Sequence, residues 1–405
     1  MENPKIRFKG YTKDWEQRKF SELYARSSEK NDGSIGMDKN ITVATMQFKN
    51  DVKVSTTEYL KTYYTFKLGD IAFEGHQSKE FRYGRFVEND IGNGIVSHIF
   101  AVFRPIQEYD LYFWKYAINN ETLMQRILAR STKASTMMHD LVTNDFLNET
   151  FLVPSVKEQK QIGAFLNKLD NLITLHQRKC DEVKSLKKYM LQKMFPQNEQ
   201  KVPEIRFEGF TEAWEQRKLG DLVDRVTRKN QDLVSELPLT ISAQYGLIDQ
   251  NEFFDKRVAS KDVSGYYLIE NGEFAYNKST STDAPWGAIK RLDRYENGVL
   301  STLYIVFGIK ENNPVDSDFL VSYYSTNLWH KGIHEIAAEG ARNHGLLNIA
   351  PADFFETKLM IPQDIEEQKK IGKYFEELER LITLHQQKCE ELKKIKKFML
   401  QKMFV

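Results

Sequence analysis

The feature that most constrains the fold of this 405-residue chain is that much of its sequence occurs twice. The pentapeptide WEQRK at residues 15–19 returns at residues 214–218, and the stretch from EQKQIG to MLQKMF at residues 158–195 returns, slightly altered, at residues 367–404. The stretches between these blocks match only weakly. Two copies are too few for a solenoid, which needs about three or more repeats. The pattern therefore predicts a dimer-like arrangement fused into one chain, with an internal pseudo-two-fold axis and a repeated frame around two divergent inserts.

The second repeated block predicts a long helix in each copy. Residues 158–195 contain no proline, and their apolar side chains recur in steps of four and three, which is the a/d seam of a coiled coil. At ~1.5 Å per residue each helix should be about 55 Å long. The positions expected at the helix interface are Ile162, Leu166, Leu169, Ile173, His176 and Cys180 in the first copy, and Ile371, Phe375, Leu378, Ile382, His385 and Cys389 in the second.

Further apolar residues widen this stripe beyond what a two-stranded coiled coil requires. They are Phe165, Leu172 and Leu186 in the first copy and Tyr374, Leu381 and Ile395 in the second. One helical partner cannot cover so wide a stripe, so we expect additional helices from another chain. The alternative is that these residues pack on the globular domains of the same chain.

The His–Cys pairs in the middle of each helix raise the question of a metal site. His176 with Cys180 and His385 with Cys389 have i,i+4 spacing, so four zinc ligands could converge between antiparallel helices. We favour a simpler interpretation, in which the histidine fixes the helix register and the cysteine fills a small apolar space. The sequence therefore predicts no metal site.

The inserts mix short β-rich runs with helical stretches at residues 111–129 and 319–330, which is typical of compact α+β domains. We therefore expect a first domain at residues 1–156, a long helix at 157–200, a second domain at 201–364 and a second long helix at 365–405.

No catalytic signature occurs in either insert. The sequence has no G-x-x-x-x-G-K-[ST] phosphate loop, no complete dinucleotide fingerprint and no H-E-x-x-H metal motif. The tripeptide ETK at residues 356–358 is similar to part of a nuclease site, but its counterpart at 149–151 lacks the lysine. The chain is therefore predicted not to be an enzyme. With two cysteines, no apolar leader and no long apolar run, it is expected in the cytoplasm and not in a membrane.

Both inserts carry polar, glycine-punctuated stretches at matching positions, one after the first third and one near the end. Arg, Lys, Asn, Gln, Ser and Thr are the residues that read base edges and phosphates in the major groove. A solvated surface loop is the alternative for any single residue. The candidate DNA contacts are His76, Gln77, Ser78, Lys79, Arg82, Tyr83, Arg85, Lys133 and Ser135 in the first insert, and Asn277, Lys278, Ser279, Thr280, Ser281, Trp286, Arg342, Asn343 and His344 in the second.

The whole pattern resembles the DNA specificity subunits of type I restriction–modification systems. The resemblance rests on the E-Q-x-x-I motif at residues 158–162 and 367–371, which follows a proline and opens a long helix, and on the doubled WEQRK. Turns at Gly69-Asp70 and Gly272-Glu273 also fit, although the second has glutamate in place of aspartate. The resemblance covers essentially the whole chain.

This resemblance implies a non-catalytic subunit with two target recognition domains, each reading one half of a bipartite sequence in double-stranded DNA. The two long helices would pack antiparallel, join the two domains and set the half-site spacing. They would also dock two modification subunits that bind S-adenosylmethionine and methylate adenine N6. Two restriction subunits using ATP and Mg²⁺ would complete the complex, so no cofactor is expected in this chain. Contact residues vary within such a family, so the candidates above rest on position and chemistry.

The net charge of +1 is low for a nucleic-acid-binding protein. The basic excess lies on the long helices and not on either insert. We therefore expect the chain alone to bind DNA weakly and partner subunits to supply much of the phosphate neutralisation. The competing hypothesis is a duplicated protein-binding scaffold without a DNA role.

Overall fold

The computed structural model describes residues 3–49, 56–135, 138–197, 200–242, 245–256, 258–282, 284–311, 315–337, 342–343 and 345–404. The chain divides into two compact units. Unit 1 comprises residues 1–178 and 386–405, and unit 2 comprises residues 179–385. Each unit therefore contains one globular domain and a segment of both long helices.

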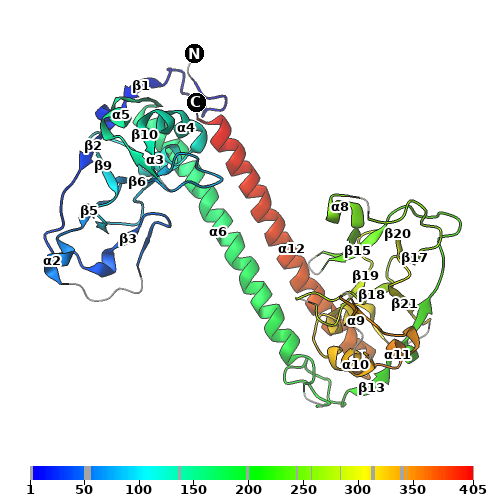
Figure 1. Ribbon diagram of the computed structural model, residues 1–405. Coiled ribbons are helices and arrows are strands. Elements are labelled where there is room, and N and C mark those ends of the chain that lie inside the picture. The colour runs from blue at the N-terminus through cyan, green and yellow to red at the C-terminus, as the bar shows by residue number, and fades with distance from the viewer. Residues whose placement is uncertain are drawn as a thin grey trace. The chain divides into compact units, whose positions relative to one another are not determined.

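Unit 1 is built around a four-stranded antiparallel sheet with the order β2-β9-β6-β7, accompanied by two-stranded ladders β1–β12, β3–β4, β5–β8 and β10–β11 (Figure 1). The expected helix at residues 111–129 is wrong in its continuity, because Asn120 starts a second helix by accepting a hydrogen bond from the amide of Thr122. The elements are β1 (Glu16–Lys19), α1 (Phe20–Leu23), β2 (Tyr24–Ser27), η1 (Met37–Lys39), β3 (Ile41–Thr42), β4 (Gln47–Phe48), α2 (Thr57–Leu60), β5 (Tyr64–Phe66), β6 (Ile71–Glu74), β7 (Arg85–Glu88), β8 (Gly94–Val96), β9 (Ala101–Pro105), α3 (Leu111–Ile118), α4 (Glu121–Ser131), β10 (Thr132–Ala134), β11 (His139–Leu141), α5 (Thr143–Asn148), β12 (Thr150–Val153) and the long helix α6 (Val156–Lys193).

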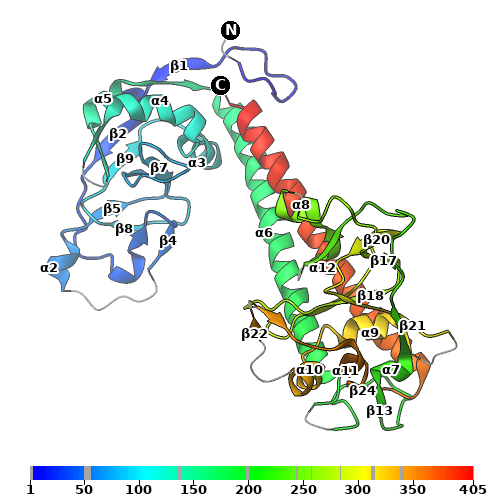
Figure 2. The same ribbon diagram turned by 45° about the vertical axis from the view of Figure 1, so that its right-hand side comes forward.

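Unit 2 repeats this plan with a four-stranded sheet of order β14-β21-β18-β19 and ladders β13–β24, β15–β16, β17–β20 and β22–β23 (Figure 2). The expected helix at residues 319–330 is helical only as far as Tyr323, and the next helix begins at His330. The elements are β13 (Glu215–Lys218), α7 (Leu219–Leu222), β14 (Val223–Val226), β15 (Leu239–Ser242), β16 (Gly246–Asp249), α8 (Gln250–Phe254), β17 (Tyr267–Glu270), β18 (Phe274–Asn277), β19 (Ala288–Arg291), β20 (Asn297–Leu300), β21 (Ile305–Ile309), α9 (Ser317–Tyr323), α10 (His330–Ile336), β22 (Arg342–Asn343), β23 (Leu346–Leu347), α11 (Pro351–Phe355), β24 (Lys358–Ile361) and the long helix α12 (Ile365–Lys402).

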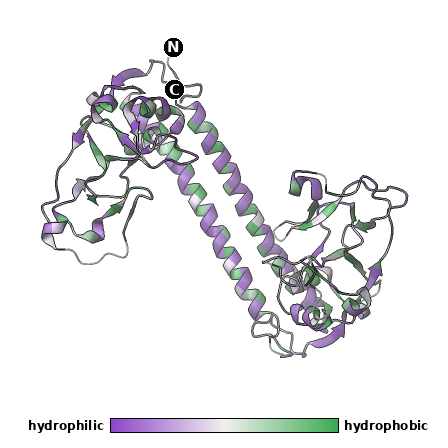
Figure 3. Cartoon of the chain, viewed as in Figure 1, coloured by the Kyte–Doolittle hydropathy of each residue, from purple (hydrophilic) through white to green (hydrophobic). Residues whose placement is uncertain are grey.

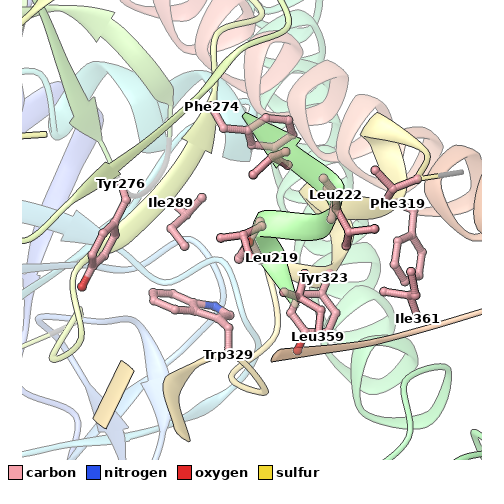
Figure 4. Close-up of a cluster of buried hydrophobic side chains, with 14 of the residues drawn as sticks. Leu219, Leu222, Phe274, Tyr276, Ile289, Phe319, Tyr323, Trp329, Leu359 and Ile361 are labelled. Carbon is pink, nitrogen blue, oxygen red and sulfur yellow. The ribbon is translucent and has the colours of Figure 1, made fainter. Parts of the chain in front are cut away.

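Aromatic side chains dominate the core of each domain. In unit 2, Tyr276 stacks on Phe354 with ring centroids 4.9 Å apart, and Phe274 stacks on Phe307 at 5.4 Å. Figure 4 shows Phe274, Tyr276 and Trp329 around Leu219 in this core. Stacked and edge-to-face rings contribute packing beyond their buried area, so the sheet is held firmly beneath the loops at its edge.

The long helices pack antiparallel within each unit. In unit 1, the Cys389 thiol lies 3.9 Å from the carbonyl oxygen of Ile173, and the Lys396 ammonium lies 2.6 Å from the Asp170 carboxylate. Cys180 faces the carbonyl oxygen of Ile382 in the same way in unit 2. Hydrophobic and hydrophilic residues alternate along both helices (Figure 3), as the seam predicts.

The extra apolar residues of the helices mostly pack on the chain's own domains. Phe165, Leu172 and Ile395 lie against the core of unit 1, and Tyr374 lies against the core of unit 2. These four residues are half-buried, so the globular domains cover them in part, and covering helices from another chain stay a prediction. Leu186 remains 43% exposed.

The E-Q motif joins the start of each long helix to its domain. In unit 1, the buried Glu158 carboxylate accepts hydrogen bonds from Arg7 at 2.6 and 2.9 Å. The buried Gln159 amide accepts from the backbone N–H of Asp110 and donates to the carbonyl of Pro154. Glutamate thus binds the segment before β1, while glutamine binds the start of α3, which explains why these two residue types occur together.

Unit 2 reproduces these contacts residue for residue. Glu367 accepts two hydrogen bonds from Arg206 at 2.6 and 2.7 Å, and Gln368 joins the N–H of Asp316 to the carbonyl of Pro362. The repeated motif is therefore a structural joint in both units.

The far end of each long helix is also tied to a domain. The Ile6 amide donates to the carbonyl of Lys402 at the end of α12, in unit 1, and the Ile205 amide donates to that of Lys193 at the end of α6, in unit 2. Within the described part of the chain, we find no helix whose length and hydrophobicity would let it span a membrane.

Candidate nucleic-acid interface

In unit 1, the structure brings the two predicted polar stretches together at one edge of the central sheet. The loop that follows β6 meets the β10–β11 hairpin, because the His139 amide donates to the carbonyl of Gly75 at 2.8 Å and His76 forms a β-bridge with Met138. Residues far apart in the sequence thus form one surface. Its loop side chains at 76–79 and 82, and those of Lys133 and Ser135 on the hairpin, are exposed.

His139 is the residue that joins the two segments through its side chain. Its buried ring lies with Nε2 2.6 Å from Gln77 Nε2 and Nδ1 3.3 Å from the Thr132 hydroxyl, and its edge packs on Tyr83. Sequence reasoning missed this role, since a lone histidine carries no spacing signal. The loop is therefore held in place by a residue outside it.

Several predicted contacts in unit 1 also have a role within the loop itself. The Ser78 hydroxyl accepts from the amides of Glu80 and Phe81, which closes a turn, and the Ser135 hydroxyl donates to the carbonyl of Met138. These bonds shape the loop and the hairpin that present the neighbouring side chains.

Arg85 is the most constrained of the predicted basic residues in unit 1. Its guanidinium donates to the Glu74 carboxylate at 2.8 Å and to the Ala44 carbonyl at 2.7 Å, and it lies over the ring of Phe81. By contrast, Arg82 is exposed, with its guanidinium 5.5 Å from the Tyr83 ring centroid. Lys79, Arg82 and Lys133 are therefore the better placed cations for an external ligand.

Unit 2 forms an equivalent surface after β18. The Thr280 amide donates to the carbonyl of Gly345 at 2.6 Å, the Leu347 amide donates to that of Lys278, and Ser279 forms a β-bridge with Leu346. The β22–β23 hairpin thus occupies the place that β10–β11 has in unit 1. The same two segments meet in both units although their sequences differ.

The predicted residues of this loop differ in exposure. Ser279 and Ser281 are exposed, whereas Lys278, Thr280 and Trp286 are half-buried. Burial lowers the pKa of the Lys278 ammonium. Trp286 packs edge-to-face against the imidazole ring of His334, with the ring centroids 5.0 Å apart.

Asn277 lies at the start of the loop, and Arg342 and Asn343 lie on the hairpin. The Asn277 amide donates to the Tyr304 hydroxyl at 3.3 Å, and its side-chain oxygen accepts from the Ser279 amide. Arg342 and Asn343 form β22, of which the backbone is described, and His344 lies outside the described residues.

The predicted helix-interface residues are mostly buried, with His176, Ile173 and His385 half-buried. The thiols of Cys180 and Cys389 each face a backbone carbonyl of the opposite helix. Among the described residues, no group of three or more His, Cys, Asp or Glu side chains is arranged to hold a metal ion.

The comparisons with known proteins bear on this architecture. The chain matches the family described as type I restriction modification DNA specificity domain over residues 12–185 and again over 211–394. A comparison with curated proteins gives no significant match. The two matches follow the internal repeat and together cover most of the chain.

One solved structure shows the same fold at low sequence identity. The S subunit of the type I restriction–modification system from M. genitalium is 16% identical, with a TM-score of 0.59 and coverage of 100% of this chain and 99% of that one. The HsdS subunit from Thermoanaerobacter tengcongensis is 15% identical, with a TM-score of 0.47 and 96% coverage of each chain. From the doubled family match over this two-unit fold, we conclude that the chain belongs to the family of type I restriction–modification DNA specificity subunits, which are non-catalytic.

Proposed function

We propose that each unit of this specificity subunit reads one half of a bipartite DNA target through its loop–hairpin surface. The observation that carries the proposal is that this surface occurs in both units. The loop after β6 pairs with the β10–β11 hairpin in unit 1, and the loop after β18 pairs with the β22–β23 hairpin in unit 2. The two surfaces share a backbone plan and differ in side chains. That is the arrangement expected when two half-sites of different sequence are read by one scaffold.

The exposed side chains suit the major groove of double-stranded DNA. Lys79, Arg82 and Lys133 in unit 1 can bind phosphates or guanine, and Ser279 and Ser281 in unit 2 can bind bases or phosphates. The constrained residues beneath them keep the loops from collapsing. Such pre-organisation reduces the entropy lost on binding.

The long helices set the spacing between the half-sites in this proposal, as dimer geometry does in two-fold DNA-binding proteins. They also dock two modification subunits, which bind S-adenosylmethionine, flip an adenine out of each half-site and methylate its N6. Two restriction subunits that use ATP and Mg²⁺ complete the cytoplasmic complex.

A domain exchange tests independent reading. Replacing residues 17–156 with the corresponding segment of another specificity subunit should change one half of the methylated sequence, as mapped on DNA modified by the assembled complex. Replacing residues 216–364 is the matched control and should change only the other half. If either exchange altered both halves, the units would not read independently.

A helix insertion tests the spacing role separately. Four residues inserted after Val183 add about one helical turn, ~6 Å, to α6. The methylated target should then have a longer spacer, or the complex should fail to assemble. Methylation with the original spacer would refute the role of the helices as a ruler.

The scaffold hypothesis makes the opposite prediction in a gel shift. A DNA-reading subunit should bind its target weakly alone and tightly with modification subunits, and the affinity should fall steeply with salt because phosphate contacts release counterions. A protein-binding scaffold would give no salt-dependent shift in either state.

A further inference from the structure

An exposed aliphatic residue stands at the same turn in both units. Ile99 is 73% exposed and Leu303 is 53% exposed. Ile99 lies in the four-residue turn between β8 and β9, and Leu303 lies in the four-residue turn between β20 and β21. The Phe100 amide closes the first turn on the Ser97 carbonyl at 3.1 Å, and the Tyr304 amide closes the second on Ser301 at 3.0 Å.

The fold itself does not require these residues. Turns favour Gly, Asn, Asp and Ser, whose backbone preferences and side-chain hydrogen bonds stabilise them. A single exposed aliphatic residue is common on protein surfaces. Its occurrence at the same turn position in two domains of divergent sequence is harder to assign to chance, and the turn gains no core packing from the exposed side chains.

The strand register places both turns beside the candidate DNA surfaces. In unit 1, Phe73, one residue before the end of β6, pairs with Ala101, the first residue of β9. The turn and the loop after β6 therefore leave the sheet on the same side. In unit 2, Tyr276 pairs with Ile305, which gives the same relation. There the Asn277 side chain donates to the hydroxyl of Tyr304, within the turn itself.

We propose that Ile99 and Leu303 are apolar DNA contacts, one per half-site, that pack against thymine 5-methyl groups in the major groove. This inference rests on the proposed function and adds a residue class that the polar candidates lack. Apolar contact with that methyl group distinguishes thymine from the other bases. The occupant is DNA because the polar loop and hairpin at the same sheet edge suit a nucleic acid.

The test compares two exposed aliphatic residues at opposite ends of β9. Ile106 is 56% exposed and follows the strand at its other end. In the complex assembled with modification subunits, Ile99→Ser should weaken binding to the target duplex about tenfold, whereas Ile106→Ser should bind as the wild type does. Because both side chains are exposed, neither change removes core packing, and circular dichroism should confirm folding.

Two further readouts separate an apolar contact from other roles. Ile99→Ser should leave the salt dependence of binding unchanged. Lys79→Gln should lower the slope of log affinity against log salt concentration by about one if that lysine binds a phosphate. Replacing target thymines one at a time by uracil removes their 5-methyl groups. At one position of the unit 1 half-site, this replacement should weaken binding by the wild type and should not weaken binding by Ile99→Ser any further. Leu303→Ser should show the same pattern in the other half-site.

The outcomes distinguish this inference from the proposed function. If the wild-type complex binds without sequence preference, the proposed function fails. If the wild type is specific and Ile99→Ser binds within twofold of it, or if Ile99→Ser fails to assemble with modification subunits, the turn is not a DNA contact. Uracil substitution that weakens both proteins equally would also overturn the thymine contact.

Discussion

The joint between Arg7 and Glu158 allows a prediction with a defined magnitude. The Glu158 side chain is 1% exposed and that of Arg7 is 14% exposed, with the closest nitrogen and oxygen 2.6 Å apart. Glu158→Gln keeps the shape but removes the negative charge, so the guanidinium is left buried without its counterion. Breaking a buried ion pair from one side costs about 3–5 kcal/mol. We therefore expect the free energy of unfolding of unit 1 to fall by that amount.

The assay is urea denaturation of the full chain, with hydrogen exchange followed by mass spectrometry to locate the effect. Glu58→Gln is the control, because Glu58 is 82% exposed in its ion pair with Lys61 and exposed pairs contribute about 0–1 kcal/mol. Exchange should quicken around Glu158 and not in unit 2. A loss from Glu158→Gln no larger than the control's would refute the argument from burial.

The equivalent change in unit 2 provides an internal repeat of the experiment. Glu367 is 1% exposed and Arg206 is 11% exposed, at the same distance of 2.6 Å. Glu367→Gln should therefore produce a loss of similar size, with faster exchange in unit 2. Unequal losses would show that the two joints do not stabilise their units in the same way.

Three other predictions concern unit 1. Gly163→Ala should destabilise unit 1 by about 1–3 kcal/mol, since a Cβ atom would lie 2.3 Å from the Asp110 carboxylate oxygen. Urea denaturation would contradict this if the variant were more stable than the wild type, because the gain in helix propensity would then outweigh the close contact. Burial, together with the charge of a neighbouring carboxylate, raises the pKa of Glu88 well above its usual range. The folded state therefore holds a proton that the unfolded state releases near pH 4.3, and stability should fall by about 1.4 kcal/mol per unit as pH rises from there to the folded pKa. Glu88→Gln should remove this pH-dependent loss of stability. Denaturation of both proteins at pH 5 and pH 7.5 would refute the prediction if the difference between their free energies of unfolding were the same at the two pH values. Finally, His139→Leu should speed hydrogen exchange in the loop containing Gln77 and relax discrimination in one half-site, whereas unchanged exchange would mean that the imidazole does not hold the loop.

The sequence predicted the two long helices, because their apolar residues recur every three to four positions along the chain. The α+β domains followed from the mixture of β-rich and helical runs, and the antiparallel packing followed from the family resemblance. The sequence was less successful with the short helices. The helical stretch expected at residues 111–129 is interrupted at Asn120, whose side chain caps a new helix. Local capping of this kind competes with apolar periodicity and is visible only at the level of single hydrogen bonds.

The candidate site was predicted in outline. The two polar stretches of each insert were identified from composition, and the structure places them together. Their support was not predictable, because His139, Glu74 and Tyr304 act through contacts with residues distant in sequence. The individual base contacts stay predictions.

By itself, the sequence determined the duplication, the seam of the helices and the family, since all three are carried by residue order. Only the tertiary structure decided which part of the wide apolar stripe the domains cover and what the E-Q motif binds. It also decided which polar residues are exposed, as Lys79 is, and which are committed inside the unit, as Arg85 is. The physical reason is that burial and ion pairing are settled by neighbours that strand register and helix packing bring together.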